Sequence, residues 1–219
     1  MRISHSKKFL FVHIQKTAGT SFVTVLKENI PDLKSFMGGH DHALLAKEQL
    51  GAKWSDYYKV AFVRNPWDRL VSWYTMIEEK GKQSWYQRMR KNWYKRIRTF
   101  SKYNRFRQYV LSNSTSFEEF LHNCIDTIDD IDGKISILYN QLDYITDSNG
   151  SIIVDFIGRF ENIDEDTATV FKALGLDNVR LPHKNISKHK DYRSYYTEET
   201  KNLVSQRYAR DIDFFGYEF

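Results

Sequence analysis

Short apolar runs separated by turn residues fill the first thirty positions of the chain. Residues 7–14 (KKFLFVHI) predict a buried strand, because their apolar positions are contiguous, and residues 15–20 (QKTAGT) predict a tight loop. Residues 21–30 (SFVTVLKENI) predict a helix that ends before Pro31. This order of strand, loop and helix is the arrangement in which a helix N-terminus binds phosphate.

The same order of elements recurs further along the chain. Residues 33–37 predict a short strand, residues 43–50 a helix, and residues 57–63 (YYKVAFV) a third strand. The dipeptide Asn65-Pro66 then supplies a cap and a first-turn proline for a helix to about Glu78. Two such units within the first 80 residues predict an α/β fold, in which helices flank a central parallel sheet.

The second half of the chain is predicted to be mostly helical. Between about residues 82 and 115, apolar residues recur every three or four positions, which predicts amphipathic helices inserted into a single domain over residues 1–219. The dipeptide Asn149-Gly150 predicts a hairpin turn between strands at 142–146 and 151–157. A further helix is expected to begin at the capping box Ser116–Glu119, and others are expected at about 164–174 and at 197–211.

Composition narrows the class of protein. Hydrophobic residues make up 41% of the chain, and Gly (10) and Pro (3) are few, which excludes a disordered or collagen-like chain. The single cysteine, Cys124, cannot form an internal disulfide, and the apolar run near the N-terminus is too short for a signal peptide or a membrane span. We therefore expect a cytoplasmic protein without a transmembrane segment, and peripheral contact with a membrane stays open.

Positive charge is concentrated in one segment. Of the net charge of +5, residues 80–117 supply +11, from Lys and Arg without any Asp or Glu, so the rest of the chain carries −6. A cationic block with interleaved aromatic residues predicts contact with an anion, such as a nucleic acid, a lipid surface, an acidic glycan or a phosphorylated cofactor.

The loop at residues 15–21 (QKTAGTS) carries groups that bind an anion. The first N–H groups of a helix lack intrahelical partners, Gly19 lets the backbone approach a ligand, and Lys16 adds a full positive charge. This is not a Walker A motif, because there the lysine follows the last glycine, whereas Lys16 precedes Gly19. An ordinary strand-to-helix turn with a solvated lysine is the alternative.

A second motif begins where the third predicted strand ends. Arg64 follows that strand, and Ser72 lies eight residues later on the next helix, so both side chains can converge on one phosphate, with Arg69 as a weaker candidate. An arginine fork suits a terminal phosphate, since its donors match two oxygens at once.

Together, Lys16-Thr17-x-Gly19-Thr20-Ser21 and Arg64-x7-Ser72 resemble the two phosphate-binding loops of sulfotransferases that use 3′-phosphoadenosine 5′-phosphosulfate (PAPS). The similar group is the carbohydrate sulfotransferases that include the chondroitin, dermatan and uronyl 2-O enzymes and bacterial relatives, and segments 155–162 and 185–219 also resemble it. The resemblance implies a sulfotransferase or nucleotide-kinase-like fold with a P-loop-like phosphate site, and sulfuryl transfer from PAPS to a carbohydrate hydroxyl without a metal. It implies donor binding by Lys16, Thr17, Ala18, Gly19, Thr20, Ser21, Arg64 and Ser72.

The same resemblance points to a general base. In the uronyl 2-O enzymes a His-x-His pair follows the phosphosulfate loop, and His40 and His42 match it here. We expect His42 to take the acceptor proton, with His40 as support or alternative, and Lys16 to neutralise the leaving oxygen. The alternative is that His40 caps a helix and His42 packs beneath it. Glu161 is a further candidate for the base.

Weaker predictions concern the remaining contacts. Lys190 lies in a basic stretch that closes over the donor in the similar group, although a solvated charge run is the simpler interpretation. Glu161 and Arg159 are candidates for binding the acceptor, as are Arg88 and Lys95 in the basic segment. The expected acceptor is an oligosaccharide, polysaccharide or glycolipid, with an acidic one fitting best.

Two other functions stay open at this point. A nucleotide kinase or hydrolase with a degenerate phosphate loop predicts binding of ATP or GTP with Mg²⁺. A non-catalytic nucleic-acid-binding protein would use the basic aromatic segment, but it would not need two phosphate loops in the acidic part of the chain.

Overall fold

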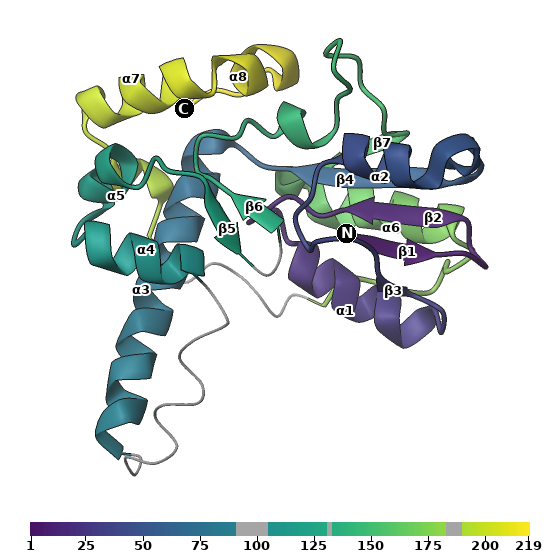
Figure 1. The fold of residues 1–219 in the computed structure, drawn as a ribbon, viewed down its shortest axis with the longest axis horizontal. Helices are drawn as coiled ribbons and strands as arrows, with labels where there is room; N and C mark the ends of the chain where they lie inside the picture. The colour runs from purple at the N-terminus through teal and green to yellow at the C-terminus, as the bar shows by residue number, and fades with distance from the viewer. Residues whose placement is uncertain (91–104, 131–132, 183–189) are drawn as a thin grey trace.

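A mostly parallel sheet forms the centre of the molecule (Figure 1). The computed structural model describes residues 1–90, 105–130, 133–182 and 190–219, with only the helical backbone for residues 82–90. Within these ranges the sheet has the order β3-β1-β2-β4-β7, in which β2, β4 and β7 are parallel and β1 is antiparallel to β2 and β3. The strands are β1 (Arg2–Ser4), β2 (Phe9–Val12), β3 (Lys34–Ser35), β4 (Tyr58–Val63) and β7 (Phe156–Arg159).

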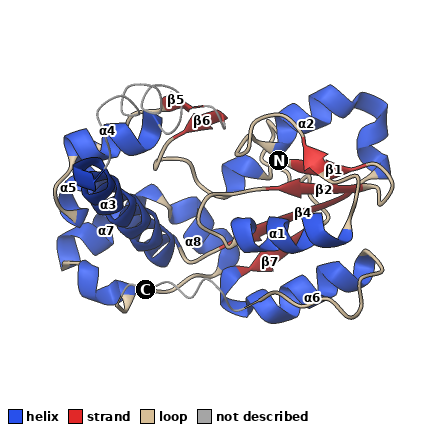
Figure 2. Ribbon diagram, turned by 90° about the horizontal axis from the view of Figure 1, so that it is seen from below, coloured by secondary structure: helices blue, strands red, loops and turns tan. Residues whose placement is uncertain are grey.

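Both faces of the sheet are buried. Alternate residues of β2 and β4, such as Phe11 and Phe62, pack on one face with the apolar side of α1 (Gly19–Asn29) and α6 (Ile163–Ala173). The residues between them contribute to the core on the other face, which includes side chains from α2 (Ala43–Leu50) and α3 (Pro66–Arg90). Figure 2 shows α1 and α6 together on one side of the strands. Burial on both faces explains why β2 and β4 are continuous apolar runs.

Several of the later helices pack against the long helix α3 (Figure 1). None of the helices in the described ranges is long and apolar enough to span a bilayer. The elements here are α4 (Arg105–Asn113), α5 (Phe117–Asn123), the hairpin of β5 (Ile128–Asp130) and β6 (Gly133–Ile135), α7 (Glu198–Arg207) and α8 (Ala209–Phe215). Short 3-10 helices are η1 (Gly51–Asp56), η3 (Leu142–Tyr144), η4 (Phe160–Asn162) and η5 (Tyr192–Tyr195).

The predicted hairpin at residues 142–157 is only partly present. The turn exists, with Gly150 in the left-handed region and Asp147 Oδ1 accepting hydrogen bonds from the next turn residues, but a single bridge, Thr146 to Ile152, joins its arms. The chain then leaves the turn to form β7, which pairs in parallel with β4 instead. Much of the predicted insertion at 82–115 lies outside the described residues.

Candidate functional site

The loop between β2 and α1 has an unusual backbone. Lys16 and Ala18 both adopt positive φ, 70° and 64°, which costs L-residues about 1–2 kcal/mol each. Thr17 between them is fully buried, and its hydroxyl donates to the Ile14 carbonyl at 3.0 Å. The Thr17 hydroxyl therefore closes the turn. Backbone strain of this kind concentrates at functional sites.

Gly19 begins α1 against the ring of His13. A Cβ at Gly19 would lie 2.1 Å from Cδ2 and Nε2 of His13, so any larger residue would clash. Thr20 is exposed and Ser21 is half-buried in the same first turn. The glycine is thus required by a neighbouring side chain of the protein, which the motif alone does not indicate.

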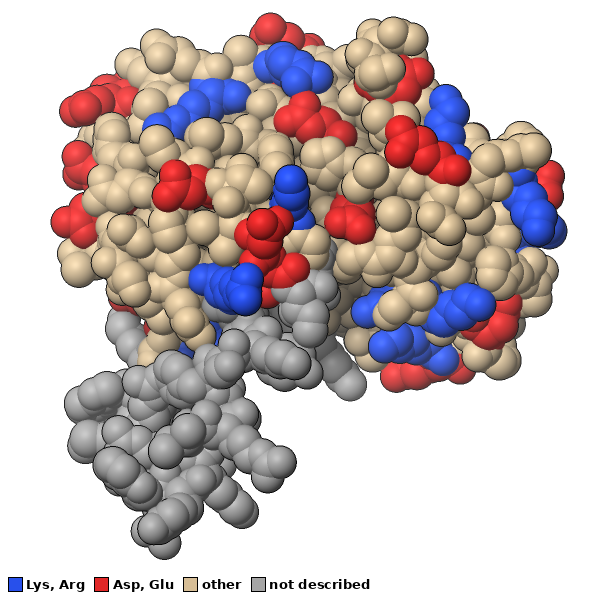
Figure 3. Space-filling view, viewed as in Figure 1, with Lys and Arg blue, Asp and Glu red and all other residues tan. Residues whose placement is uncertain are grey.

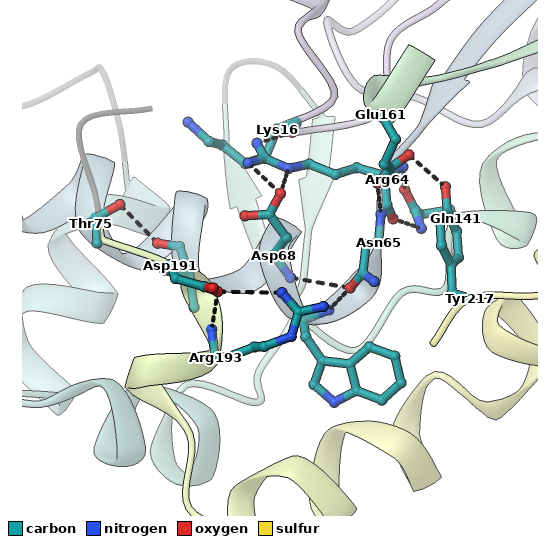
Figure 4. Close-up of polar contacts among 12 residues, drawn as sticks. Lys16, Arg64, Asn65, Asp68, Thr75, Gln141, Glu161, Asp191, Arg193 and Tyr217 are labelled. Atoms are coloured by element: carbon teal, nitrogen blue, oxygen red, sulfur yellow. Dashed lines mark hydrogen bonds and ion pairs between the residues drawn. The ribbon is translucent and has the colours of Figure 1, made fainter. Parts of the chain in front are cut away.

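Two arginines that follow β4 hold consecutive carbonyls of this loop. Arg64 Nη1 donates to the Lys16 carbonyl at 3.2 Å, and Arg69 Nε donates to the Gln15 carbonyl at 3.1 Å. Arg69 has no exposed surface, so it acts beneath the loop, a role that the sequence does not signal. The two motifs predicted from the sequence therefore meet in space, although Lys16 and Arg64 are 48 positions apart, and Figure 4 shows Arg64 extended beside Lys16.

The Arg64 side chain is fixed by several contacts. Its Nε and Nη2 each lie 2.7 Å from Asp68 Oδ2, one helical turn into α3, and its guanidinium lies 3.8 Å from the ring centre of Phe160. Ser72, one turn after Asp68, is buried as well. The arginine is thus oriented before any ligand arrives.

Positive charge in this part of the site is only partly compensated. The pKa of the Lys16 ammonium is lowered from an ordinary value near 10.5 to about 8, mainly by burial and also by the charges of Arg64 and Lys80, against an opposing effect of Glu79. An anion bound beside Lys16 would favour the charged ammonium and so raise this pKa.

The predicted histidines lie in two different environments. His40 Nδ1 lies 2.9 Å from the His13 carbonyl, and because a carbonyl oxygen only accepts, Nδ1 carries the proton and the neutral ring keeps its lone pair on Nε2. The ring centres of His40 and His13 are 4.6 Å apart, and the His13 ring also packs against Gly19. His13 therefore lies between His40 and the loop that precedes α1. His13 stacks on Phe11, and burial holds the pKa of its ring well below the ordinary value.

His42 instead stands at the N-cap of α2 between two tyrosines. Its ring centre lies 4.5 Å from that of Tyr144 and 5.1 Å from that of Tyr139. Burial lowers the pKa of His42, while Asp143 and Asp41 act in the opposite direction. His42 is therefore half-buried in an aromatic contact, whereas His40 contacts His13, against which Gly19 of the loop between β2 and α1 packs.

Glu161 and Arg159 both bind other parts of the protein. Glu161 Oε1 accepts the Asn65 N–H at 2.6 Å, and its other oxygen lies 3.4 Å from the Tyr217 hydroxyl. The guanidinium of Arg159 donates to the Phe215 carbonyl and lies over the Tyr217 ring. These contacts join the end of β7 to the start of α3 and to the C-terminal segment, and acceptor binding by either residue stays a prediction.

The remaining candidates lie towards the periphery. Lys190 is exposed, just before η5, which packs against α3. Lys95 and the side chain of Arg88 fall outside the described residues. On the face drawn in Figure 3, the basic and acidic side chains that can be described are interspersed. Most of the segment for which a cationic surface is predicted, residues 80–117, has side chains outside the described part of the chain.

Metal-binding chemistry finds no support in the described ranges. They hold no group of three or more His, Cys, Asp or Glu residues suited to a metal ion. Asp155, the carboxylate that precedes β7, pairs with the Lys59 ammonium at 2.9 Å, at the amino end of β4.

Comparison with known proteins identifies the family of the chain. The profile of the sulfotransferase family matches residues 1–218. An uncharacterized protein from Archaeoglobus fulgidus is 30% identical over 156 residues, which cover 69% of this chain and 96% of the relative. Carbohydrate sulfotransferase 14 from Danio rerio is 26% identical over 98% of this chain, which spans 61% of that relative's length. No solved structure matches significantly. The match over nearly the whole chain shows that this protein belongs to the sulfotransferase family.

Proposed function

We propose that the protein transfers the sulfuryl group of PAPS to a hydroxyl of a carbohydrate acceptor. The observation that carries this proposal is the double clamp between the two motifs, in which Arg64 and Arg69 bind the carbonyls of Lys16 and Gln15. The clamp brings the cationic side chains of Lys16 and Arg64 into one site, as a nucleotide with phosphate at both its 5′ and 3′ positions requires. The carbohydrate acceptor is inferred from the name of the Danio rerio relative.

The described residues fit such a donor. The first N–H groups of α1, together with Lys16, would hold the 5′ phosphosulfate, and Arg64 and Ser72 would hold the 3′-phosphate. During transfer, negative charge grows on the oxygen that bridges the donor phosphate and sulfur. The Lys16 ammonium would stabilise that charge, and since the site is already formed, little reorganisation is needed.

The acceptor hydroxyl must lose its proton as it attacks sulfur. Of the two predicted histidines, His40 suits this role better, because its Nδ1–H is fixed on the His13 carbonyl and Nε2 holds the lone pair. A base placed in this way contributes about 10²- to 10⁴-fold in rate. Our sequence-based preference for His42 stays an untested alternative, and its contact with Tyr144 suits a neighbour that shapes the acceptor side.

Calorimetric titration separates this activity from the alternatives. We expect adenosine 3′,5′-bisphosphate to bind more tightly than ATP with Mg²⁺, and Arg64→Met to remove most of that preference. Tighter binding of ATP with Mg²⁺ would favour a kinase or hydrolase. Salt-sensitive retention of RNA that Lys16→Met leaves unchanged would favour a nucleic-acid-binding protein.

The base is tested by turnover measured beside donor binding. His40→Ala should leave the affinity for the bisphosphate unchanged and lower turnover at least about 100-fold. The matched variant, His42→Ala, should lower it less. A larger loss of turnover in His42→Ala than in His40→Ala would assign the base to His42. Full turnover in both variants would point to Glu161 as the base.

A further inference from the structure

The backbone of Arg64 has an unusual partner. β4 pairs with β7 only as far as Val63, opposite Arg159, so the next residue has left the sheet ladder. The side-chain amide of Gln141 takes over at that point, accepting the Arg64 N–H at 2.8 Å and donating to the Arg64 carbonyl at 2.8 Å. The Gln141 side chain thus makes the two backbone hydrogen bonds that a neighbouring strand would make to Arg64, although the two residues are 77 positions apart in the sequence.

Gln141 is itself held in place by Asp211. Asp211 of α8 accepts the Gln141 backbone N–H at 2.7 Å, its Nε2–H at 3.3 Å and the Leu142 N–H at 3.0 Å. Gln141 and Asp211 have no exposed surface. A buried amide with both ends hydrogen-bonded, on a carboxylate that accepts three N–H groups, has little freedom to reorient.

We propose that Gln141, braced by Asp211, is a positioning residue for Arg64 that sets the preference for a nucleotide with a 3′-phosphate. This inference rests on the proposed function, because it assigns the 3′-phosphate to Arg64. The amide fixes the backbone from which the guanidinium reaches Asp68 and the Lys16 carbonyl. A bidentate contact between arginine and phosphate tolerates little displacement, so a shift of this backbone weakens the 3′-phosphate contact selectively.

The test measures a ratio of affinities. For each variant, calorimetry gives the dissociation constants of adenosine 3′,5′-bisphosphate and of adenosine 5′-monophosphate, which lacks the 3′-phosphate. Gln141→Met keeps the side-chain volume and removes both hydrogen bonds, and it should lower the preference for the bisphosphate about tenfold. Asp211→Asn, a milder change, should lower it by a smaller factor while the chain stays folded. A general destabilisation of the fold would weaken the binding of both nucleotides alike and leave the ratio of their dissociation constants unchanged.

Two controls isolate the effect. Lys59→Met removes the ion pair between buried Lys59 and exposed Asp155 at the other end of β4, and it should leave the ratio within about twofold of the wild type. In an Arg64→Met background, Gln141→Met should have no further effect on the ratio, because Gln141 acts through Arg64.

The outcomes distinguish this inference from the function on which it rests. A wild-type protein without preference for the bisphosphate overturns both. If the wild type shows the preference, and folded Gln141→Met or Asp211→Asn keeps it in full, only the positioning role is overturned. If Gln141→Met lowers the preference for the bisphosphate further in the Arg64→Met background, the positioning role is overturned as well.

Discussion

The lowered pKa of Lys16 makes donor binding dependent on pH in a predictable direction. In the free protein this ammonium titrates near 8, because it is buried and lies close to Arg64. A bound nucleotide phosphate supplies the missing negative charge, so the pKa of Lys16 rises on binding and the complex takes up a proton. Affinity is therefore highest below pH 8 and falls as the pH rises through that value.

The size of the effect follows from the same value. With a pKa of about 8, roughly nine in ten Lys16 side chains are protonated at pH 7 and about one in ten at pH 9. If the complex restores the ordinary pKa near 10.5, the dissociation constant rises about tenfold between pH 7 and pH 9. At pH 8 the complex should take up about half a proton, which calorimetry in buffers of different ionisation enthalpy measures directly.

Lys16→Arg provides the matched control. Arginine keeps its charge throughout this range, and the nucleotide phosphates are already dianionic above pH 7, so the affinity of the variant should be nearly constant. A wild-type affinity that changes no more than that of Lys16→Arg, with no proton uptake at pH 8, would refute the assignment of Lys16 to the phosphate.

Three further predictions concern the fold around the site. Gly19→Ala places a methyl group against the His13 ring and should lower the free energy of unfolding by about 1–3 kcal/mol in urea titrations, and adding His13→Ala should restore most of it. Asn65→Ala removes the cap on the Trp67 N–H and should cost about 1 kcal/mol in the same assay, whereas Asn65→Asp should cost less. Cys124 is buried and burial raises the pKa of its thiol, so iodoacetamide should label it slowly in the native protein and rapidly in urea; rapid native labelling would contradict its burial.

The parallel part of the fold was predictable because its signals are local. The contiguous apolar runs that became β2 and β4 are buried on both faces, and Asn65-Pro66 begins α3 as its capping chemistry requires. The short strand β1 and the hairpin of β5 and β6 were missed, since segments of three residues carry too little periodicity to be recognised. The arms of the predicted hairpin failed for another reason: β7 gains a parallel partner in β4, and no local pattern reveals a partner a hundred residues away.

The residues of the candidate site also differ in how far local sequence reveals them. The residues that we propose to bind the ligand through loop and helix-start chemistry, such as Lys16 and Arg64, stand in short motifs and can be found in the sequence. Gln141 and Asp211 cannot, because their partners lie 77 and 70 positions away and nothing in their neighbours marks them as polar groups of the interior. What marks them is complete burial, together with hydrogen bonds that lead from Asp211 through Gln141 to the residue that follows β4. The preference that we assign to Arg64 therefore depends as much on a glutamine outside both motifs as on the arginine that would bind the phosphate.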